Sequence, residues 1–242
     1  MPDGTAELEP RKQNRSAEEL EMRALVAAEL RKQYPAARIV HEMPLRYSTN
    51  RLDLAAITPS QIVAVEIKSS KDVLSRLEAQ LRAFGPVCSK IIVALAPCWN
   101  EALPHIEEEH PPKTARDGQI LSPGWKSYRQ QYTEAQATIR DARQRFSWIE
   151  TWTADAATGA IAVTEAGYRE NPWPWHGEML HILRVSELRE IAEQYGIASR
   201  TVHKELVMAC CQNMTGQQII AAVCRSLRLR EGFAAGSDMP VA

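Results

Sequence analysis

Apolar and polar positions in the first hundred residues follow helical and strand periodicities in turn. Apolar side chains recur at helical spacing between Met22 and Leu30. Ser16 precedes them, with Glu19 three residues later, which is the spacing of a capping box at a helix start. Alternating residues and then a continuous apolar run follow, which are typical of half-buried and fully buried strands. The expected elements are a helix over 16–33, strands over 38–43, 51–57 and 62–68, a helix over 72–84, and a strand over 90–96.

The rest of the chain is less regular. Prolines interrupt the stretch after residue 97, and a polar helix is expected over about 126–145. A hairpin is expected over 147–152 and 160–164, and helical spacing returns from Met179 to about Arg230. The predicted organisation is a disordered tail over 1–15, a core over 16–170 with an insertion at about 97–145, and a helical subdomain over 179–232 that is a candidate for DNA binding.

The most informative segment is a predicted hairpin with a Thr-Pro-Ser-Gln turn. If Ile57 pairs with Ile62, Asp53 lies opposite Glu66, and Lys68 shares the face of Glu66. The other face of both strands is then wholly apolar, so this register separates a core face from a polar one. That apolar face consists of Leu52, Leu54, Ala56, Val63, Val65 and Ile67.

Opposed carboxylates on this hairpin need compensation. Their Cβ atoms would lie about 5 Å apart, and the charges would repel by on the order of 3 kcal/mol at an effective dielectric near 20. A divalent cation between the two carboxylates would turn this repulsion into a net attraction. Mg²⁺ is a suitable cation because it prefers oxygen ligands. Lys68 could orient or deprotonate an attacking water, or neutralise charge on a phosphate. The alternative is a cross-strand ion-pair ladder on a solvated face, formed by Arg51, Asp53, Glu66 and Lys68.

The composition indicates an ordinary globular protein but does not identify its binding partner. Apolar residues make up 45% of the chain and charged residues 24%, which is ordinary for a globular protein. The net charge of -1 means that any DNA-binding surface must be local. No apolar run approaches the roughly 18 residues that span a bilayer, and the N-terminus lacks the apolar core of a signal peptide. We therefore expect a cytoplasmic protein with no membrane partner.

At the hairpin the sequence resembles the PD-(D/E)XK nuclease superfamily, whose members carry an acidic residue on one strand and Glu-x-Lys on the next. Asp53 and the run Glu66-Ile67-Lys68 match that pattern, and the elements predicted from about 16 to 96 match the superfamily's αβββαβ core. Leu52 stands where the superfamily often has proline. The resemblance implies an α/β, restriction-endonuclease-like fold with a mixed central sheet flanked by helices and a small C-terminal helical region.

The resemblance also implies an activity. The expected function is hydrolysis of DNA phosphodiester bonds by a metal-dependent nuclease, with endonuclease and exonuclease action both left open. Mg²⁺, with Mn²⁺ able to substitute, would be held by Asp53, Glu66 and Ile67, and Lys68 would assist the attacking water. DNA is the expected partner, and a homo-oligomer is left open.

Two further positions follow from the resemblance. Members often carry a glutamate on the first helix, for which Glu19 fits best, and some branches carry Gln-x-x-x-Tyr on the second helix, where Gln80 stands with Phe84 in place of tyrosine. Both have structural alternatives, an acid favoured by the helix dipole and a surface polar residue. Glu42 is a weaker candidate, and His41 is expected to be structural. Other first-helix candidates are Glu18, Glu21 and Glu29.

Residues 186–206 resemble a helix-turn-helix. In that interpretation Val202 and Leu206 pack inward, and Arg200 and Lys204 point toward DNA. A small SAP-like module, or a helical bundle that only packs on the core, are the alternatives. Further residues invoked are Gly196 at the turn, Ser199, Thr201 and His203 on the exposed face, and Arg225, Arg228 and Arg230 as phosphate contacts.

Three functions therefore compete. The first is the metal-dependent nuclease, and the second is a nuclease-like protein that has lost activity and serves DNA binding or assembly. The third is a helix-turn-helix regulator, which leaves the acidic hairpin unexplained. Intact Asp53, Glu66 and Lys68 favour the first.

Overall fold

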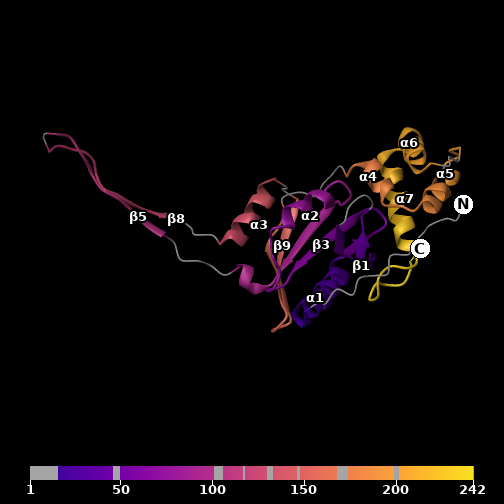
Figure 1. Cartoon of the computed structure of the whole chain (residues 1–242), viewed down its shortest axis with the longest axis horizontal. Helices are drawn as coiled ribbons and strands as arrows, with labels where there is room; N and C mark the ends of the chain where they lie inside the picture. Colours follow the sequence, from indigo (N-terminus) through magenta and orange to yellow (C-terminus); the bar gives the residue numbers. More distant parts are fainter. Residues whose placement is uncertain are drawn as a thin grey trace, which may run out of the picture.

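A mixed six-stranded sheet forms the centre of the molecule (Figure 1). The computed structural model describes residues 16–45, 50–100, 106–116, 118–129, 133–145, 148–167, 174–198 and 202–241. The strand order is β1-β2-β3-β4-β9-β10, in which β3–β4 and β4–β9 are parallel and the other pairs antiparallel. The strands are β1 (Arg38–Pro44), β2 (Arg51–Ile57), β3 (Ile62–Lys68), β4 (Lys90–Leu95), β9 (Ile149–Asp155) and β10 (Ala160–Glu165).

Helices pack against both faces of this sheet. On one face α1 buries Met22, Val26 and Leu30 in a core cluster with the sheet. On the other face α2, α3 and the C-terminal helices share a second cluster. Among the described residues, no helix combines the length and apolar character needed to cross a bilayer. The helices are α1 (Ala17–Gln33), α2 (Leu77–Phe84), η1 (Pro97–Asn100), α3 (Glu134–Arg145), α4 (His176–His181), α5 (Val185–Gln194), α6 (His203–Asn213) and α7 (Gly216–Leu229).

The predicted order of helix, three strands, helix and strand is confirmed, with strand ends within one residue of the expected ones. Ser16 caps α1 by accepting a hydrogen bond from the main-chain N–H of Glu19, as the capping-box spacing indicated. The hairpin predicted after residue 147 is present as β9 and β10. Local periodicity was sufficient for these elements because their buried faces follow a single repeat.

The second helix is shorter than predicted. It begins at Leu77, with Arg76 as its N-cap, rather than at residue 72. The Asp72 carboxylate instead accepts hydrogen bonds from the main chain and hydroxyl of Ser69, both at 2.7 Å. These bonds close a turn directly after β3, so the carboxylate competes with helix formation over these residues.

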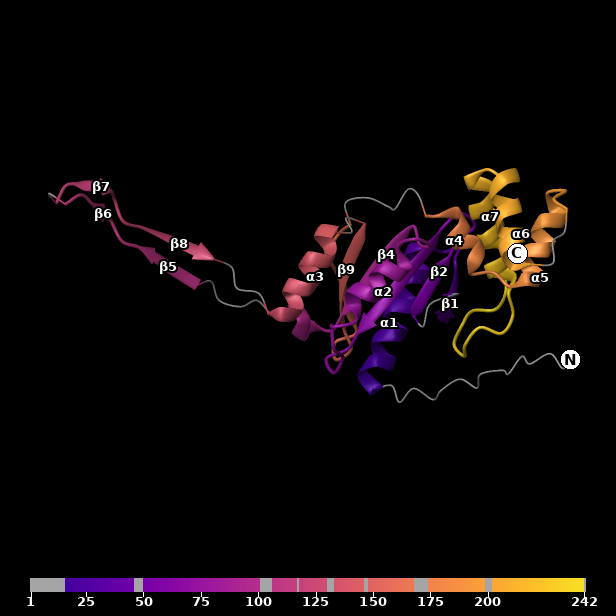
Figure 2. The same cartoon turned by 45° about the horizontal axis from the view of Figure 1, so that its top comes forward.

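The expected helix over 126–145 is wrong in its first part. β5 (Ile106–His110) pairs with β8 (Trp125–Arg129) in a ribbon that extends away from the sheet, with β6 (Lys113–Thr114) and β7 (Ile120–Ser122) at its far end (Figures 1 and 2). His110 stacks on Trp125 at 3.8 Å between ring centroids, and Lys126 pairs with Glu107 and Glu109. These partners lie far away in sequence, which is why the local helical pattern misled.

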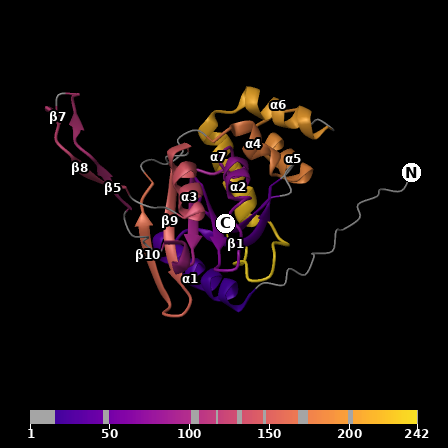
Figure 3. The same ribbon diagram turned by 60° about the vertical axis from the view of Figure 1, so that its left-hand side comes forward.

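The C-terminal segment after α7 folds back onto β1 (Figure 3, yellow). The N–H of Asp238 donates to the carbonyl of Ile39 at 2.8 Å, and its carboxylate accepts from the N–H of Ile39 at 2.9 Å. Arg38 is buried and donates to the carbonyls of Asp238, Arg230 and two residues of α7. The tail therefore covers the edge strand of the sheet and ties α7 to it.

Candidate functional site

The predicted hairpin register is confirmed from Leu54 to Ile57, but the ladder ends at Leu54 and Val65, so the expected pair of Asp53 with Glu66 is not part of it. Leu54 pairs with Val65 and Ile57 with Ile62, as the separation of apolar and polar faces required. Beyond Leu54 the strands are held by a side chain, because the carboxylate of Asp53 accepts a hydrogen bond from the main-chain N–H of Ile67 at 2.8 Å. Asp53 therefore lies at the point where β2 and β3 separate.

The predicted apolar face is wrong at one position. Leu54 is buried in the cluster beside α1, whereas Leu52 is buried in the cluster beside α2. The alternation of β2 therefore breaks at Asp53. The neighbouring strand is distorted too, since Glu42 has a φ of 51°, a left-handed conformation that residues other than glycine rarely adopt. The carboxylates of Asp53 and Glu42 both contact Arg23 of α1.

Glu66 and Lys68 are buried on the side of the sheet that faces α2. Glu66 is only 2% exposed, and its Oε1 accepts hydrogen bonds from Lys68 Nζ at 2.7 Å and from Gln80 Nε2. Lys68 Nζ also donates to Gln80 Oε1 at 3.1 Å. Gln80, singled out on the second helix, is thus joined directly to the two hairpin residues.

The second carboxylate oxygen of Glu66, unlike the first, is not hydrogen-bonded to any described residue. Oε2 is buried and has no hydrogen-bond partner among the described residues. Burial, together with the charge of Asp53, raises the pKa of Glu66 from 4.5 to about 8, although Lys68 and Gln80 favour the charged form. A buried carboxylate oxygen without a partner is costly, so this atom calls for a proton or a cation.

Arg23 is the site residue that the sequence did not reveal. Its Nη2 lies 3.0 Å from Asp53 Oδ1, 3.2 Å from Glu19 Oε1 and 3.2 Å from Glu42 Oε1. Burial lowers the pKa of the guanidinium, but Asp53, Glu42 and Glu19 more than offset that effect, so the pKa is raised. A signal was present, since Arg23 interrupts the apolar face of α1 beside Met22 and four residues after Glu19.

This arginine changes the electrostatic argument made from the hairpin alone. Two carboxylates were expected to need an external cation, but each has a buried cation of the chain beside it, Arg23 for Asp53 and Lys68 for Glu66. The solvated ion-pair ladder is not formed either, because Glu66 and Lys68 are buried and Arg51 forms no ion pair with a described residue. The site is a buried, charged network.

The carboxylate oxygens of this site are of the kind that bind a hard metal ion. In the described part of the chain, no three His, Cys, Asp or Glu side chains are arranged as a metal site. Mg²⁺ needs fewer, since one or two carboxylates with water and phosphate commonly suffice. The carboxylates of Glu66 and Asp53 supply hard oxygen donors, and Oε2 of Glu66 has no hydrogen-bond partner among the described residues. These residues fit Mg²⁺, with Arg23 as the competing cation at Asp53.

The other first-helix acids lie elsewhere. The Glu18 carboxylate accepts from the main chain and hydroxyl of Ser70, at the turn after β3. Glu29 pairs with Lys32 at the helix surface. The main-chain N–H of His41 donates to the hydroxyl of Ser237 in the tail at 2.9 Å. This bond does not involve the imidazole, so the structural role of that side chain stays a prediction.

The helix-turn-helix expectation is partly wrong. Gly196 adopts a φ of +65° at the turn and Leu206 is buried, as predicted. Val202, expected to pack inward, is 52% exposed, whereas His203, expected to face DNA, is 8% exposed and stacks on His181. Val202 is the N-cap of α6 with an extended backbone, so it lies outside the helix, and the buried face of α6 consists of His203, Leu206, Val207 and Cys210.

Of the basic residues proposed to contact DNA in this region, some are exposed and one is buried. Lys204 is exposed, and Arg200 lies outside the described residues. Arg230 is buried and pairs with Glu187 at 2.6 Å, so its role is to hold α7 against α5 rather than to bind phosphate. Arg225 remains exposed on α7.

Comparison with known proteins gives one partial match. Residues 12–108 match the family model described as bacteriophage P4 protein cII. This segment contains Glu19, Asp53, Glu66, Lys68 and Gln80, but it is less than half of the chain. No curated protein and no solved structure gives a significant match. The chain is therefore similar to the cII family over the segment that carries the site, and the family's description names no activity.

Proposed function

We propose that this protein is a metal-dependent nuclease that hydrolyses phosphodiester bonds in DNA. The observation that carries the proposal is the buried Oε2 of Glu66, which has no partner among the described residues and lies in a network with Asp53, Lys68 and Gln80. A restriction-endonuclease-like core is part of the proposal. Its support is the αβββαβ order of the elements around the acidic residue and the Glu-x-Lys run.

Each residue of the network has a distinct task in this proposal. Asp53 and Glu66 would hold Mg²⁺, and Ile67 fixes Asp53 through its main-chain N–H. Mg²⁺ held there would supply a more acidic water and neutralise charge on the scissile phosphate. Lys68, held by Glu66 and Gln80, presents an ammonium that orients the attacking water and stabilises developing charge. Glu19 acts through Arg23, since that guanidinium links it to Asp53.

A second candidate is a nuclease-like DNA-binding or assembly protein without activity. The observation that favours it is Arg23, which already supplies a positive charge to Asp53, Glu19 and Glu42. In that case Arg23 takes the place of the metal, and the carboxylates serve only to hold α1 against the sheet. The regulator hypothesis loses support, because His203 is buried and Val202 is exposed.

The test is cleavage of plasmid, linear and single-stranded DNA in Mg²⁺, Mn²⁺ or EDTA. The nuclease proposal expects cleavage with metal and none in EDTA, and loss of cleavage in Glu66→Gln and Asp53→Asn. Glu150→Gln is the matched control, because Glu150 is also a buried strand carboxylate paired with a lysine, Lys90 at 2.7 Å, outside the network. Cleavage that persists in EDTA, or in both site variants, refutes the mechanism. Absence of cleavage on every substrate with either metal favours the second candidate.

A further inference from the structure

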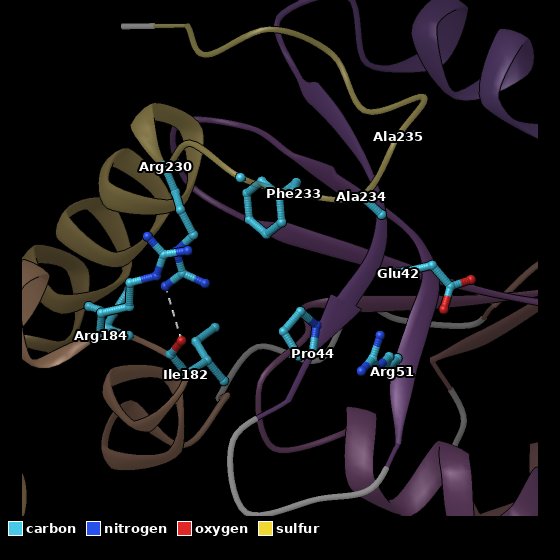
Figure 4. A pocket seen from close by; sticks show the side chains of 11 residues that line it. Glu42, Pro44, Arg51, Ile182, Arg184, Arg230, Phe233, Ala234 and Ala235 are labelled. Carbon is cyan, nitrogen blue, oxygen red and sulfur yellow. Dashed lines mark hydrogen bonds between the residues drawn. The ribbon is translucent and has the colours of Figure 1, made fainter. Parts of the chain in front are cut away.

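A pocket of about 750 Å³ lies beside the carboxylate network, between the sheet and the C-terminal helices. Figure 4 shows Arg184 and Arg230 on the side of the helices, Glu42 and Arg51 on the side of the sheet, and Phe233 of the tail between them. The volume is in the range of pockets that hold ligands. We call it the Arg51–Arg184 pocket.

The walls of this pocket are held in place by many contacts. The tail residues that line it follow Arg230, which donates to the carbonyl of Ile182 at 3.1 Å. Further along, the tail is bonded to β1 through Ser237 and Asp238. The guanidinium carbon of Arg38 lies 5.0 Å from the centroid of the Phe233 ring, and this cation–π contact helps to hold that side chain. The pocket is therefore formed before any ligand arrives, which reduces the cost of binding.

Two of the charged residues in the pocket have ion-pair partners. Arg230 is buried and pairs with Glu187 at 2.6 Å, so it leaves no net charge for a ligand. Glu42, the acidic residue of the lining, pairs with Arg23 at 3.2 Å but shares it with Asp53 and Glu19. Glu42 therefore keeps part of its negative charge, and any attraction for an anion must come from the other two arginines.

The other two arginines are not compensated. Arg51 and Arg184 are exposed, and neither forms an ion pair with a described residue. The guanidinium of Arg184 donates a long hydrogen bond, 3.4 Å, to the main-chain carbonyl of Glu231, while the main-chain N–H of Arg184 donates to Glu187. The pocket therefore has two free guanidinium groups on opposite sides, and planar guanidinium groups suit the oxygens of a phosphate.

The pocket also adjoins the proposed active site. Arg51 precedes Asp53 by two residues on β2, and Glu42 both lines the pocket and contacts the Arg23 that binds Asp53. A polymer with regularly spaced phosphates could therefore place one phosphate in the pocket and another at the carboxylates. A small isolated anion would use only the first.

We propose that the Arg51–Arg184 pocket binds a backbone phosphate of the DNA strand that enters the active site. The identity of the ligand rests on the proposed nuclease function, whereas the pocket and its charges do not. Arg51 and Arg184 are positioning residues in this account: they hold the strand and take no part in bond cleavage. The tail acquires a function as well, because it forms one wall of the site.

The test is binding of labelled duplex and single-stranded DNA in EDTA, where no cleavage occurs, at several salt concentrations. Arg51→Ala with Arg184→Ala should weaken binding and lower the log–log salt slope, by about 1.8 for duplex if each arginine meets one phosphate. Arg189→Ala is the matched control, since it removes an exposed arginine of α5, the helix that begins after Arg184, and this arginine does not line the pocket. The control should bind as the wild-type protein does.

A lysine pair, Arg51→Lys with Arg184→Lys, keeps the charge and should keep most of the salt slope. Thermal unfolding of each variant verifies that the fold is intact, and both side chains are exposed, so little change is expected. Wild-type affinity and slope in the alanine pair overturn the pocket proposal, even if the protein cleaves DNA. Weakened binding in a protein that never cleaves supports the pocket and refutes the nuclease instead.

Discussion

Replacing Glu66 by glutamine removes the most unusual charge in the molecule while keeping its shape. The amide can still accept hydrogen bonds from Lys68 and Gln80 where Oε1 now does so. Its NH₂ group takes the place of Oε2, as the hydroxyl of a protonated Glu66 would. The variant thus imitates the protonated carboxyl at every pH, and the difference between the two proteins isolates the titration of one group.

The size of that difference follows from the pKa of Glu66, which rises from 4.5 to about 8 on folding because the group is buried beside Asp53. A raised pKa means that the folded protein binds the proton more tightly. The contribution to stability is therefore complete below about pH 4.5 and is lost as the pH rises toward about 8. Between about pH 5 and about pH 7 the loss amounts to on the order of 2.5 kcal/mol.

Urea unfolding of both proteins in EDTA, at pH values across this interval, measures the effect. The free energy of unfolding of the wild-type protein should fall relative to that of Glu66→Gln as the pH increases, because all other groups titrate in both proteins. Addition of Mg²⁺ near neutral pH should restore much of the loss in the wild-type protein only, since a bound cation stabilises the ionised form. Parallel pH profiles would show that Glu66 is not destabilised by burial, and the case for a cation at Oε2 would fail.

The remaining predictions concern the cations of the site and of the helical region. Lys68→Ala should lose turnover and keep its affinity for DNA, because the ammonium acts on water and on developing charge; wild-type turnover would remove it from the mechanism. Arg23→Gln should destabilise the metal-free protein by about 3 kcal/mol, and Mg²⁺ should raise its midpoint of thermal unfolding more than that of the wild type; equal shifts would mean that arginine and metal do not compete at Asp53. Arg200→Ala with Lys204→Ala should lower the salt slope of DNA binding by up to about 1.8 if both meet phosphate, and an unchanged slope would leave α6 as a packing element.

The parts of the site that were predictable are those fixed by one strand pair. Alternation and a four-residue turn determine which residues of β2 and β3 face each other, so Glu66 and Lys68 could be placed on one face of β3 from the sequence, whereas Asp53 lies beyond the last pair of the ladder. Gln80 followed from a resemblance, and its bond to Glu66 connects α2 to the same pair. Each of these inferences needs only neighbours in sequence or a single register.

Contacts between distant elements were not predictable in this way. Arg23 meets Asp53 only because α1 crosses that face of the sheet, and the tail binds Ile39 through Asp238 from the far end of the chain. His203 lies on the buried face of α6 and stacks on His181 of the distant helix α4. Periodicity records which face of an element is apolar, but it does not record which element covers that face.

The packing of the core determines which experiments can separate DNA binding by the helical region from cleavage at the carboxylates. The helical region after residue 174 buries Leu188, Leu206 and Leu227 in the same cluster as Phe84 of α2. Removing it would expose the face of the sheet that supports Glu66, so loss of activity in a truncated chain would say nothing about DNA contacts. Point substitutions at exposed arginines avoid this problem. Truncation would also remove the inferred pocket, because its walls come from the sheet, the start of α5 and the tail, and the pocket exists only when all three are present.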